Sequence, residues 1–228
     1  MQVLRTYPQG RGVYDFAPHG EHSVARGYRK AIGRARRLIY LEDQYLWSTE
    51  VAELFAHALR DNPALHVVAV VPRYPDVDGR LSLSPNLIGR QQALDVCRRA
   101  GGDRVHVYDV ENLHGTPVYV HAKVCVIDDV WACVGSDNFN RRSWTHDSEL
   151  SCAVLDDTRD GREPHDPAGN GYGARVFARE LRLRLLREHL DRCSYDGLID
   201  PAAAASTIAA SARALEDWNR CRFRGSAQ

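Results

Sequence analysis

The chain lacks an excess of charge of either sign. Its 30 lysines and arginines are balanced by 30 aspartates and glutamates over 228 residues. Proteins that bind nucleic acid through their overall field carry a basic excess, so this balance does not favour a nucleic-acid partner. Because 44% of the residues are hydrophobic and 26% are charged, we expect an ordinary globular chain whose residues 1–228 form a single domain.

Long hydrophobic runs are also missing. No segment approaches the roughly 20 apolar residues that cross a bilayer as a helix. The start of the chain, from Met1 to Arg5, has no apolar stretch behind a basic region, as a signal peptide would have. We therefore expect a protein that is cytoplasmic or touches membranes peripherally, with no signal peptide or transmembrane segment in this chain.

The six cysteines show no Cys-x-x-Cys spacing. Cys125, Cys133 and Cys152 fall inside expected strands, where cysteine behaves as a small apolar filler. This distribution predicts neither a disulfide framework nor a metal site. We expect no metal and no other cofactor.

Apolar periodicity alternates between strand and helix in the first half of the chain and becomes a run of strands in the second half. Segment 156–173 is rich in Gly, Pro and Asp and is expected to be an exposed loop. The order predicts an α/β sandwich, in which helices flank both faces of a mixed β-sheet. The expected strands are 3–7, 38–42, 66–71, 105–110, 118–127, 130–134 and 149–155, and the expected helices are 23–37, 49–61, 84–100, 174–190 and 202–218.

Residues 118–127 form the clearest expected strand. Apolar side chains occupy every second position from Val118 to Val126, the period of a strand with two different faces. Asp128 and Asp129 interrupt this run, and residues 130–134 resume it. The pattern predicts a β-hairpin with a two-residue turn at the two aspartates.

Polar residues gather on this hairpin. The turn would place His121 opposite Ser136 and Lys123 opposite Val134. Facing residues share one side of a sheet, so His121, Lys123, Ser136 and, beyond the strand, Asn138 would point the same way. A lysine supplies fixed charge while a hydroxyl and an amide donate hydrogen bonds, which indicates an anion site.

The hairpin resembles the HKD motif of the phospholipase D superfamily. The resemblance extends to segments 39–45, 147–150 and 187–190, and it is to the C-terminal halves of two-motif phospholipases D and cardiolipin-synthase-like enzymes. The family generally has two HKD motifs, whereas this chain has no second His-x-Lys pair among its ten histidines. Six positions match the motif in type and order, namely His121, Lys123, Asp128, Gly135, Ser136 and Asn138.

The resemblance implies a phosphodiesterase or phosphatidyltransferase that works through a phosphohistidine intermediate and without a metal. It implies that His121 protonates the leaving alcohol and that Lys123 and Asn138 hold phosphate oxygens. Ser136 would assist by hydrogen bonding. Glu149 would accept a hydrogen bond from His121 and so fix its tautomer.

Other candidates surround this group. Asp128 belongs to the motif, and because it sits at the turn we expect an orienting or structural role. Glu42 and Gln44 end a strand, where sites of α/β sheets commonly form. The remaining candidates for the rim of the site follow the motif, and they are Arg141, Arg142 and Trp144.

Two classes of function stay open. The first is a phospholipase D-type enzyme that acts on phospholipid headgroups at a membrane surface and takes its second HKD motif from an N-terminal half or a homodimer partner. The second is a non-catalytic or incomplete half-domain that binds an anionic ligand or a partner. An HKD-type nuclease acting as a homodimer is a further alternative, against which the neutral charge argues.

Overall fold

The structure is a computed structural model that describes residues 1–10, 14–46, 48–74 and 83–225. In these residues it has six α-helices, which are α1 (Ser23–Ile32), α2 (Thr49–Asp61), α3 (Leu83–Gly101), α4 (Arg141–Thr145), α5 (Val176–His189) and α6 (Pro201–Gly225), and a short 3-10 helix, Gly102–Arg104. The strands of the main sheet are β1 (Gln2–Tyr7), β2 (Glu21–His22), β3 (Leu38–Glu42), β4 (His66–Val70), β5 (Val105–Tyr108), β8 (Val124–Ile127), β9 (Trp131–Gly135) and β10 (Glu149–Val154). A separate two-stranded sheet is formed by β6 (Val110–Glu111) and β7 (Pro117–Val118).

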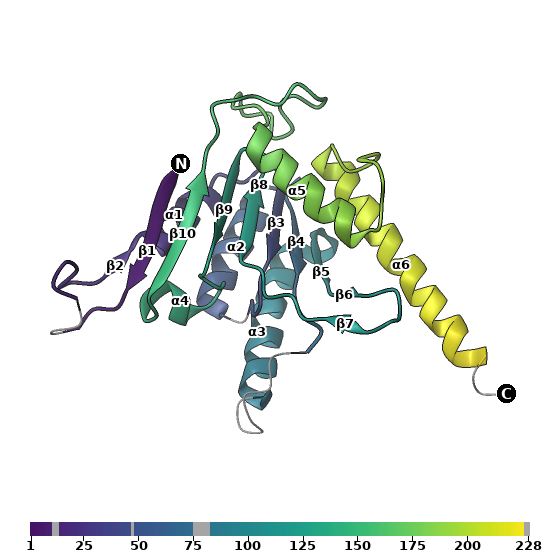
Figure 1. The fold of residues 1–228 in the computed structure, drawn as a ribbon, viewed down its shortest axis with the longest axis horizontal. Helices are drawn as coiled ribbons and strands as arrows, with labels where there is room; N and C mark the ends of the chain where they lie inside the picture. The colour runs from purple at the N-terminus through teal and green to yellow at the C-terminus, as the bar shows by residue number, and fades with distance from the viewer. Residues whose placement is uncertain (11–13, 47, 75–82, 226–228) are drawn as a thin grey trace.

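The main sheet is mixed, with the strand order β2-β1-β10-β9-β8-β3-β4-β5 (Figure 1). β3, β4 and β5 run parallel to one another, and α2 and α3 make the crossovers that parallel neighbours require. All other neighbouring pairs are antiparallel. The strand–helix alternation of the first half of the sequence therefore builds the parallel part of the sheet.

Helices cover both faces of this sheet, as the sequence predicted. Ile39 and Leu41 of β3 pack into a core that includes residues of α1, α2, α3 and α4. Leu38 and Tyr40, which point the other way, pack with residues of α5 and α6. β3 is buried at every position because both of its faces are covered.

Several strand ends meet at one end of the sheet. β3 pairs antiparallel with β8 and Glu42 lies opposite Val124, so the residues that follow β3 lie beside those that precede β8. β9 pairs antiparallel with β10 and Gly135 lies opposite Ser151, which brings the residues after β9 to the start of β10. The turn between β8 and β9 lies at the opposite end of the sheet.

The turn of the β8–β9 hairpin has the expected two residues. Asp128 and Asp129 both have positive φ angles, 54° and 57°, and Val130 N–H donates to Ile127 O over 2.9 Å. Strand pairing, however, joins Ile127 to Trp131, so Val130 is an extra residue in the second strand, a β-bulge.

The bulge corrects the register that we expected for the hairpin. Val134 pairs with Val124, and the N–H of Gly135 donates to Lys123 O over 3.1 Å. The expected pairing of Lys123 with Val134 and of His121 with Ser136 is therefore wrong by one residue. The residue beside Lys123 on β9 is therefore Gly135.

Three further segments differ from expectation. Of the strand expected over 118–127, only Val124–Ile127 pairs in the main sheet, so His121 and Lys123 precede β8 and are not part of it. The helix expected over 23–37 ends at Ile32, because the Asp128 carboxylate accepts the backbone N–H groups of Arg36 and Arg37 over 2.8 Å each and of Leu38 over 2.9 Å. Segment 156–173 contains neither helix nor strand, yet Asp160 within it is buried. No helix in the described ranges is both long and apolar enough to cross a membrane.

Candidate functional site

Lys123 lies at the centre of the sheet end where the strand ends meet. Its side chain is 9% exposed, and Nζ donates to Gln44 Oε1 and to the backbone oxygen of His121, each over 3.1 Å. Burial lowers the pKa of Lys123, while the carboxyl groups of Asp43, Glu149 and Asp137 oppose this change. The structure therefore joins two sequence candidates, Lys123 and Gln44, which are 79 residues apart.

Gln44 also connects the lysine to the segment that leads into the motif. Its Nε2 donates to Tyr119 Oη over 2.7 Å. The ring of Tyr119 lies against that of His121, with their centroids 6.4 Å apart and their planes 24° apart. His121 is exposed. The exposed residue His121 therefore contacts the buried ammonium group through its backbone oxygen.

Asp43 was missed by sequence reasoning, although it lies between two named candidates. Its carboxylate is buried and accepts N–H groups from Tyr45 over 2.9 Å, Leu46 over 2.6 Å and Phe139 over 3.0 Å. The bond to Phe139 fixes the segment after β9 against the end of β3. The position of an aspartate directly after a buried strand was the available signal.

Ser136 and Glu149 join the end of β9 to the start of β10. Ser136 Oγ donates to Glu149 Oε2 and accepts the N–H of Leu150 over 3.1 Å. In the described residues, no hydrogen bond joins the His121 ring to Glu149, and Ser136 is the residue that donates to this carboxylate. The orienting role that we expected for Glu149 stays a prediction.

Asn138 follows this junction and is 9% exposed. Its Oδ1 is buried and, within the described part of the chain, has no hydrogen-bond partner. A buried amide oxygen without a partner is unusual in a folded protein. The side chain thus retains hydrogen-bonding capacity in the segment that follows β9.

Arg141 and Arg142 begin α4 directly beyond Asn138. Both are exposed, and they line a cavity of about 270 Å³ with residues at the start of α2. Arg142 pairs with Asp147 over 2.7 Å, and Arg141 lies 3.8 Å from Glu50. These two cations are therefore on the same end of the sheet as Lys123, as a rim position requires.

Asp128 is not brought to this group. It follows β8, whereas Lys123 precedes the same strand, so that roughly 15 Å of chain separates them. Its carboxylate accepts hydrogen bonds from the three backbone N–H groups at residues 36–38. The structure therefore gives the motif aspartate a structural position.

Trp144 is a core residue, which corrects our expectation that it lies at the rim. It is 3% exposed and stacks on Tyr28 with a centroid distance of 5.4 Å and an interplanar angle of 4°. The ring belongs to the short helix α4 and packs near Phe139 in the core. Asn140 caps this helix by accepting the N–H of Ser143 over 2.8 Å.

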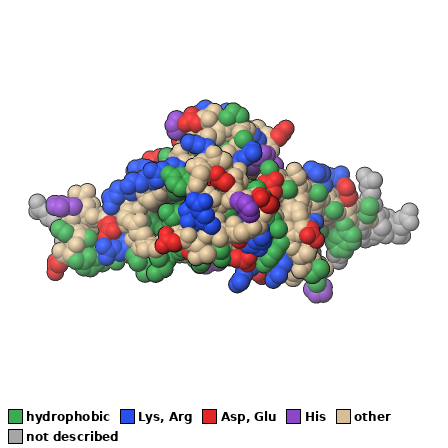
Figure 2. Space-filling view, turned by 90° about the horizontal axis from the view of Figure 1, so that it is seen from above, with side chains coloured by type: hydrophobic (Ala, Val, Ile, Leu, Met, Phe, Trp, Pro, Cys, Tyr) green, Lys and Arg blue, Asp and Glu red, His purple; other side chains and the backbone are tan. Residues whose placement is uncertain are grey.

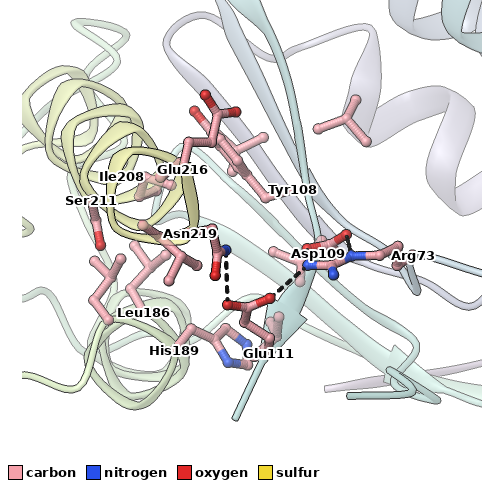
Figure 3. Close-up of a pocket in the computed structure, with 17 residues that line it drawn as sticks. Arg73, Tyr108, Asp109, Glu111, Leu186, His189, Ile208, Ser211, Glu216 and Asn219 are labelled. Atoms are coloured by element: carbon pink, nitrogen blue, oxygen red, sulfur yellow. Dashed lines mark hydrogen bonds and ion pairs between the residues drawn. The ribbon is translucent and has the colours of Figure 1, made fainter. Parts of the chain in front are cut away.

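Glu42 faces away from Lys123, toward the layer of α5 and α6. It is 3% exposed, and its Oε1 lies 2.5 Å from Tyr40 Oη and 2.8 Å from His189 Nε2. His189 lines a second cavity of about 360 Å³ between α5, α6 and the β4–β6 strands (Figure 3). Because Glu42 precedes Asp43 directly, this cluster supports the strand end from behind.

The polar side chains of the second cavity largely satisfy one another. Figure 3 shows Arg73 bonded to Asp109 and Glu111, and Asn219 Nδ2 donates to the same glutamate over 3.3 Å. Its deeper wall is apolar and includes Leu186. The cavity therefore has the character of packing space between layers.

Charges are also mixed at the opposite end of the molecule. The view from above, onto the end that carries segment 156–173, shows basic, acidic and apolar side chains interspersed (Figure 2). Among the described residues, no group of three or more His, Cys, Asp or Glu side chains is placed to hold a metal ion.

Comparison with known proteins identifies the family. Residues 28–160, more than half of the chain, match the family model described as cardiolipin synthase, PLD-like domain. The chain belongs to the PLD-like domain family. The matched range contains every candidate residue named above, from Glu42 to Glu149, and membership places the chain in a superfamily of phosphodiesterase-type enzymes.

Curated relatives are much longer than this PLD-like chain. It is 28% identical over 232 residues to phospholipase D1 of Schizosaccharomyces pombe, a match that covers 83% of this chain and 17% of the relative. It is 27% identical over 254 residues to phospholipase D1 of Homo sapiens, with 88% and 23% covered. The chain thus spans about a fifth of the length of these relatives.

A solved structure shows the same fold. Nuc from Salmonella typhimurium, a phospholipase D family member, superposes with a TM-score of 0.51 at 17% identity, and the match covers 84% of this chain and 93% of that one. Together with the mixed sheet described above, this confirms the predicted PLD-like α/β fold.

Proposed function

We propose that this chain is one half of a phospholipase D-type phosphodiesterase that hydrolyses or exchanges the headgroups of phospholipids at a membrane surface. The observation that carries the proposal is the buried Lys123, held by Gln44 beside an exposed His121. A fixed ammonium group next to a solvent-accessible imidazole suits a phosphodiester, whose charge must be neutralised while its leaving oxygen is protonated.

Each residue then has a defined task. A histidine of a second HKD motif attacks phosphorus and forms a phosphohistidine, while His121 gives its proton to the leaving alcohol. Water or another alcohol then attacks the phosphohistidine and returns a proton to His121. Lys123, Asn138 and Ser136 bind the non-bridging oxygens, and Glu149 supports His121 or the Ser136 hydroxyl.

The second histidine must come from outside this chain. Double displacement needs a nucleophile and a separate acid, and this chain has one HKD motif. An N-terminal half would supply the other, and two copies related by a two-fold axis could do the same by using one surface patch twice. We favour the N-terminal half, because the resemblance is to second halves.

A complementation assay tests this proposal. The purified chain is expected to be nearly inactive on phosphatidylcholine vesicles and to release choline when an N-terminal half with the missing HKD motif is added. His121→Ala should abolish the restored activity, whereas Asp157→Asn, a change in the exposed loop at the far end of the sheet, should not. Full turnover by a demonstrably monomeric sample of this chain would refute the two-histidine mechanism.

A further inference from the structure

Asp137 occupies the one position that the Gly-Ser-x-Asn part of the motif leaves open, and it is 1% exposed. Its Oδ1 accepts a hydrogen bond from Ser151 Oγ. Its Oδ2 is buried and, among the residues that the structure describes, has no partner. A carboxylate buried with a single donor is poorly stabilised, because each ionised oxygen needs hydrogen bonds to replace water.

Gly135 makes this arrangement possible. It pairs with Ser151 across β9 and β10, and a Cβ atom at position 135 would overlap the Ser151 side chain. The absent side chain leaves the volume in which the Ser151 hydroxyl lies as it reaches Asp137. The glycine of the motif therefore serves the bond to Asp137 in this chain.

The protonation state of Asp137 affects the net charge around Lys123. Three carboxyl groups act on this ammonium, those of Asp43, Asp137 and Glu149. Asp43 receives three backbone N–H donors, which oppose the rise that burial causes in its pKa, and Glu149 receives the Ser136 hydroxyl. If Asp137 were ionised as well, one ammonium would face three carboxylates, and a phosphodiester anion would be repelled.

Burial favours the neutral form of Asp137. Burial raises the pKa of Asp137 to about 7; the Ser151 hydrogen bond opposes this rise, and Glu149 and Asp43 add to it. In the described surroundings no cation is hydrogen-bonded to Asp137, and Lys123 acts on it only through space. The other titratable groups that face Asp137 are Tyr28 of α1, Cys125 of β8 and Cys133 of β9.

We propose that Asp137 is a positioning residue of the phosphate site that works as a neutral carboxylic acid. While it is neutral, the charge of Lys123 remains available to a phosphodiester, and its ionisation adds negative charge that weakens binding. The inference rests on the proposed function, because it takes Lys123 to be the group that binds phosphate. Anion affinity should therefore fall as the pH rises through neutrality.

Dimethyl phosphate is a suitable probe, because it is a phosphodiester whose single charge stays constant near neutral pH. Its dissociation constant would be measured by NMR titration at several pH values from about 5.5 to about 8.5, in a His121→Gln background that removes imidazole ionisation. With Asp137 present, affinity should fall roughly tenfold over this range. This is the effect expected when one negative charge is added near the bound phosphodiester and solvent partly screens the repulsion between them. In Asp137→Asn the affinity should stay nearly constant.

Two further variants sharpen the test. Ser151→Ala removes the side-chain hydroxyl that donates to Asp137 and should move the loss of affinity to higher pH, which a purely structural role would not do. It also keeps the inference testable if Asp137→Asn fails to fold. Asp157→Asn, which removes one carboxylate from the exposed loop at the far end, should reproduce the parent profile.

The outcomes separate the two claims. Binding by the parent with an equal pH profile in Asp137→Asn would overturn the role of Asp137 and leave the phosphate site intact. Absence of dimethyl phosphate binding at every pH, in the parent and all variants, would overturn the phosphate site and the inference with it. A carbon-13 NMR titration that shows Asp137 ionised at about pH 5 would overturn the inference alone.

Discussion

Individual carboxylates of this chain have different tasks that the motif alone does not distinguish. Asp43, Asp137 and Glu149 surround Lys123, whereas Asp128 lies beyond the far end of β8. Burial raises the pKa of Asp128, and three backbone N–H bonds oppose that rise. The motif aspartate thus stabilises the chain that enters β3.

Asp128→Ala is expected to lower the free energy of unfolding by about 3 kcal/mol, because three backbone N–H groups would lose a charged acceptor in a buried setting. Urea denaturation followed by circular dichroism measures this loss. Asp157→Ala, at an exposed position, is the matched control and should stay within roughly 0.5 kcal/mol of the parent. An equal loss in both variants would contradict the special role of Asp128.

Among the helices and strands, the sequence predicted correctly the bounds that local sequence signals determine. The strand Leu38–Glu42 and the helix Thr49–Asp61 have the expected bounds, since a continuous apolar run marks the first and Asn62-Pro63 ends the second. The hairpin register was wrong because β8 is buried on both faces, so its apolar pattern cannot reveal the extra residue Val130.

Other features depend on partners that are distant in the sequence. The early end of α1 is linked to Asp128, whose carboxylate takes backbone N–H groups 90 to 92 residues away. Asp43 could have been suspected from its position after a buried strand, but the importance of Asp137 depends on burial and on Lys123, which no local pattern shows. Lys123 and Gln44 could be named from the motif and the strand end, but their contact could not.

The ion pairs that hold the loop before α5 against the rest of the fold depend on pH. The Arg162 side chain donates to Asp160 and lowers the pKa of that carboxyl to about 2, and Arg179 contributes to the shift. A carboxylate with a depressed pKa stabilises the fold above its unfolded pKa near 4 and loses this contribution as the pH falls toward 2.

Asp160→Asn should therefore lower the free energy of unfolding at neutral pH by roughly 2 kcal/mol and have little effect near pH 2. Chemical denaturation at several pH values measures the difference between variant and parent. A deficit that stays the same from neutral pH to about pH 2 would mean that the ion pairs of Asp160 do not carry this stability.

The whole molecule is asymmetric, because α6 extends beyond the sheet that it partly covers (Figure 1). Ala204, Ala205 and Ile208 are buried near its start, whereas no residue of 210–221 is buried. The sheet and α5 therefore obtain most of the packing from the first two turns of this helix.

Removal of residues 212–228 should thus change the free energy of unfolding by less than about 1 kcal/mol, since little apolar area leaves the core. Thermal denaturation of the shortened chain would show the effect. Loss of cooperative unfolding would contradict the assignment of this half of α6 as peripheral to stability, whereas a shortened chain that ends before Ala204 should unfold readily.

Asp129 of the hairpin turn also bears on how small a piece of this chain could fold by itself. The range that matches the family, residues 28–160, holds every candidate site residue, but it omits Arg179 and Arg182. Both arginines are fully buried and pair with Asp129, at 3.0 Å and 2.6 Å. A fragment cut at residue 160 would lack the two cations that pair with this carboxylate, so during synthesis the β8–β9 hairpin gains its final support only after α5 has left the ribosome.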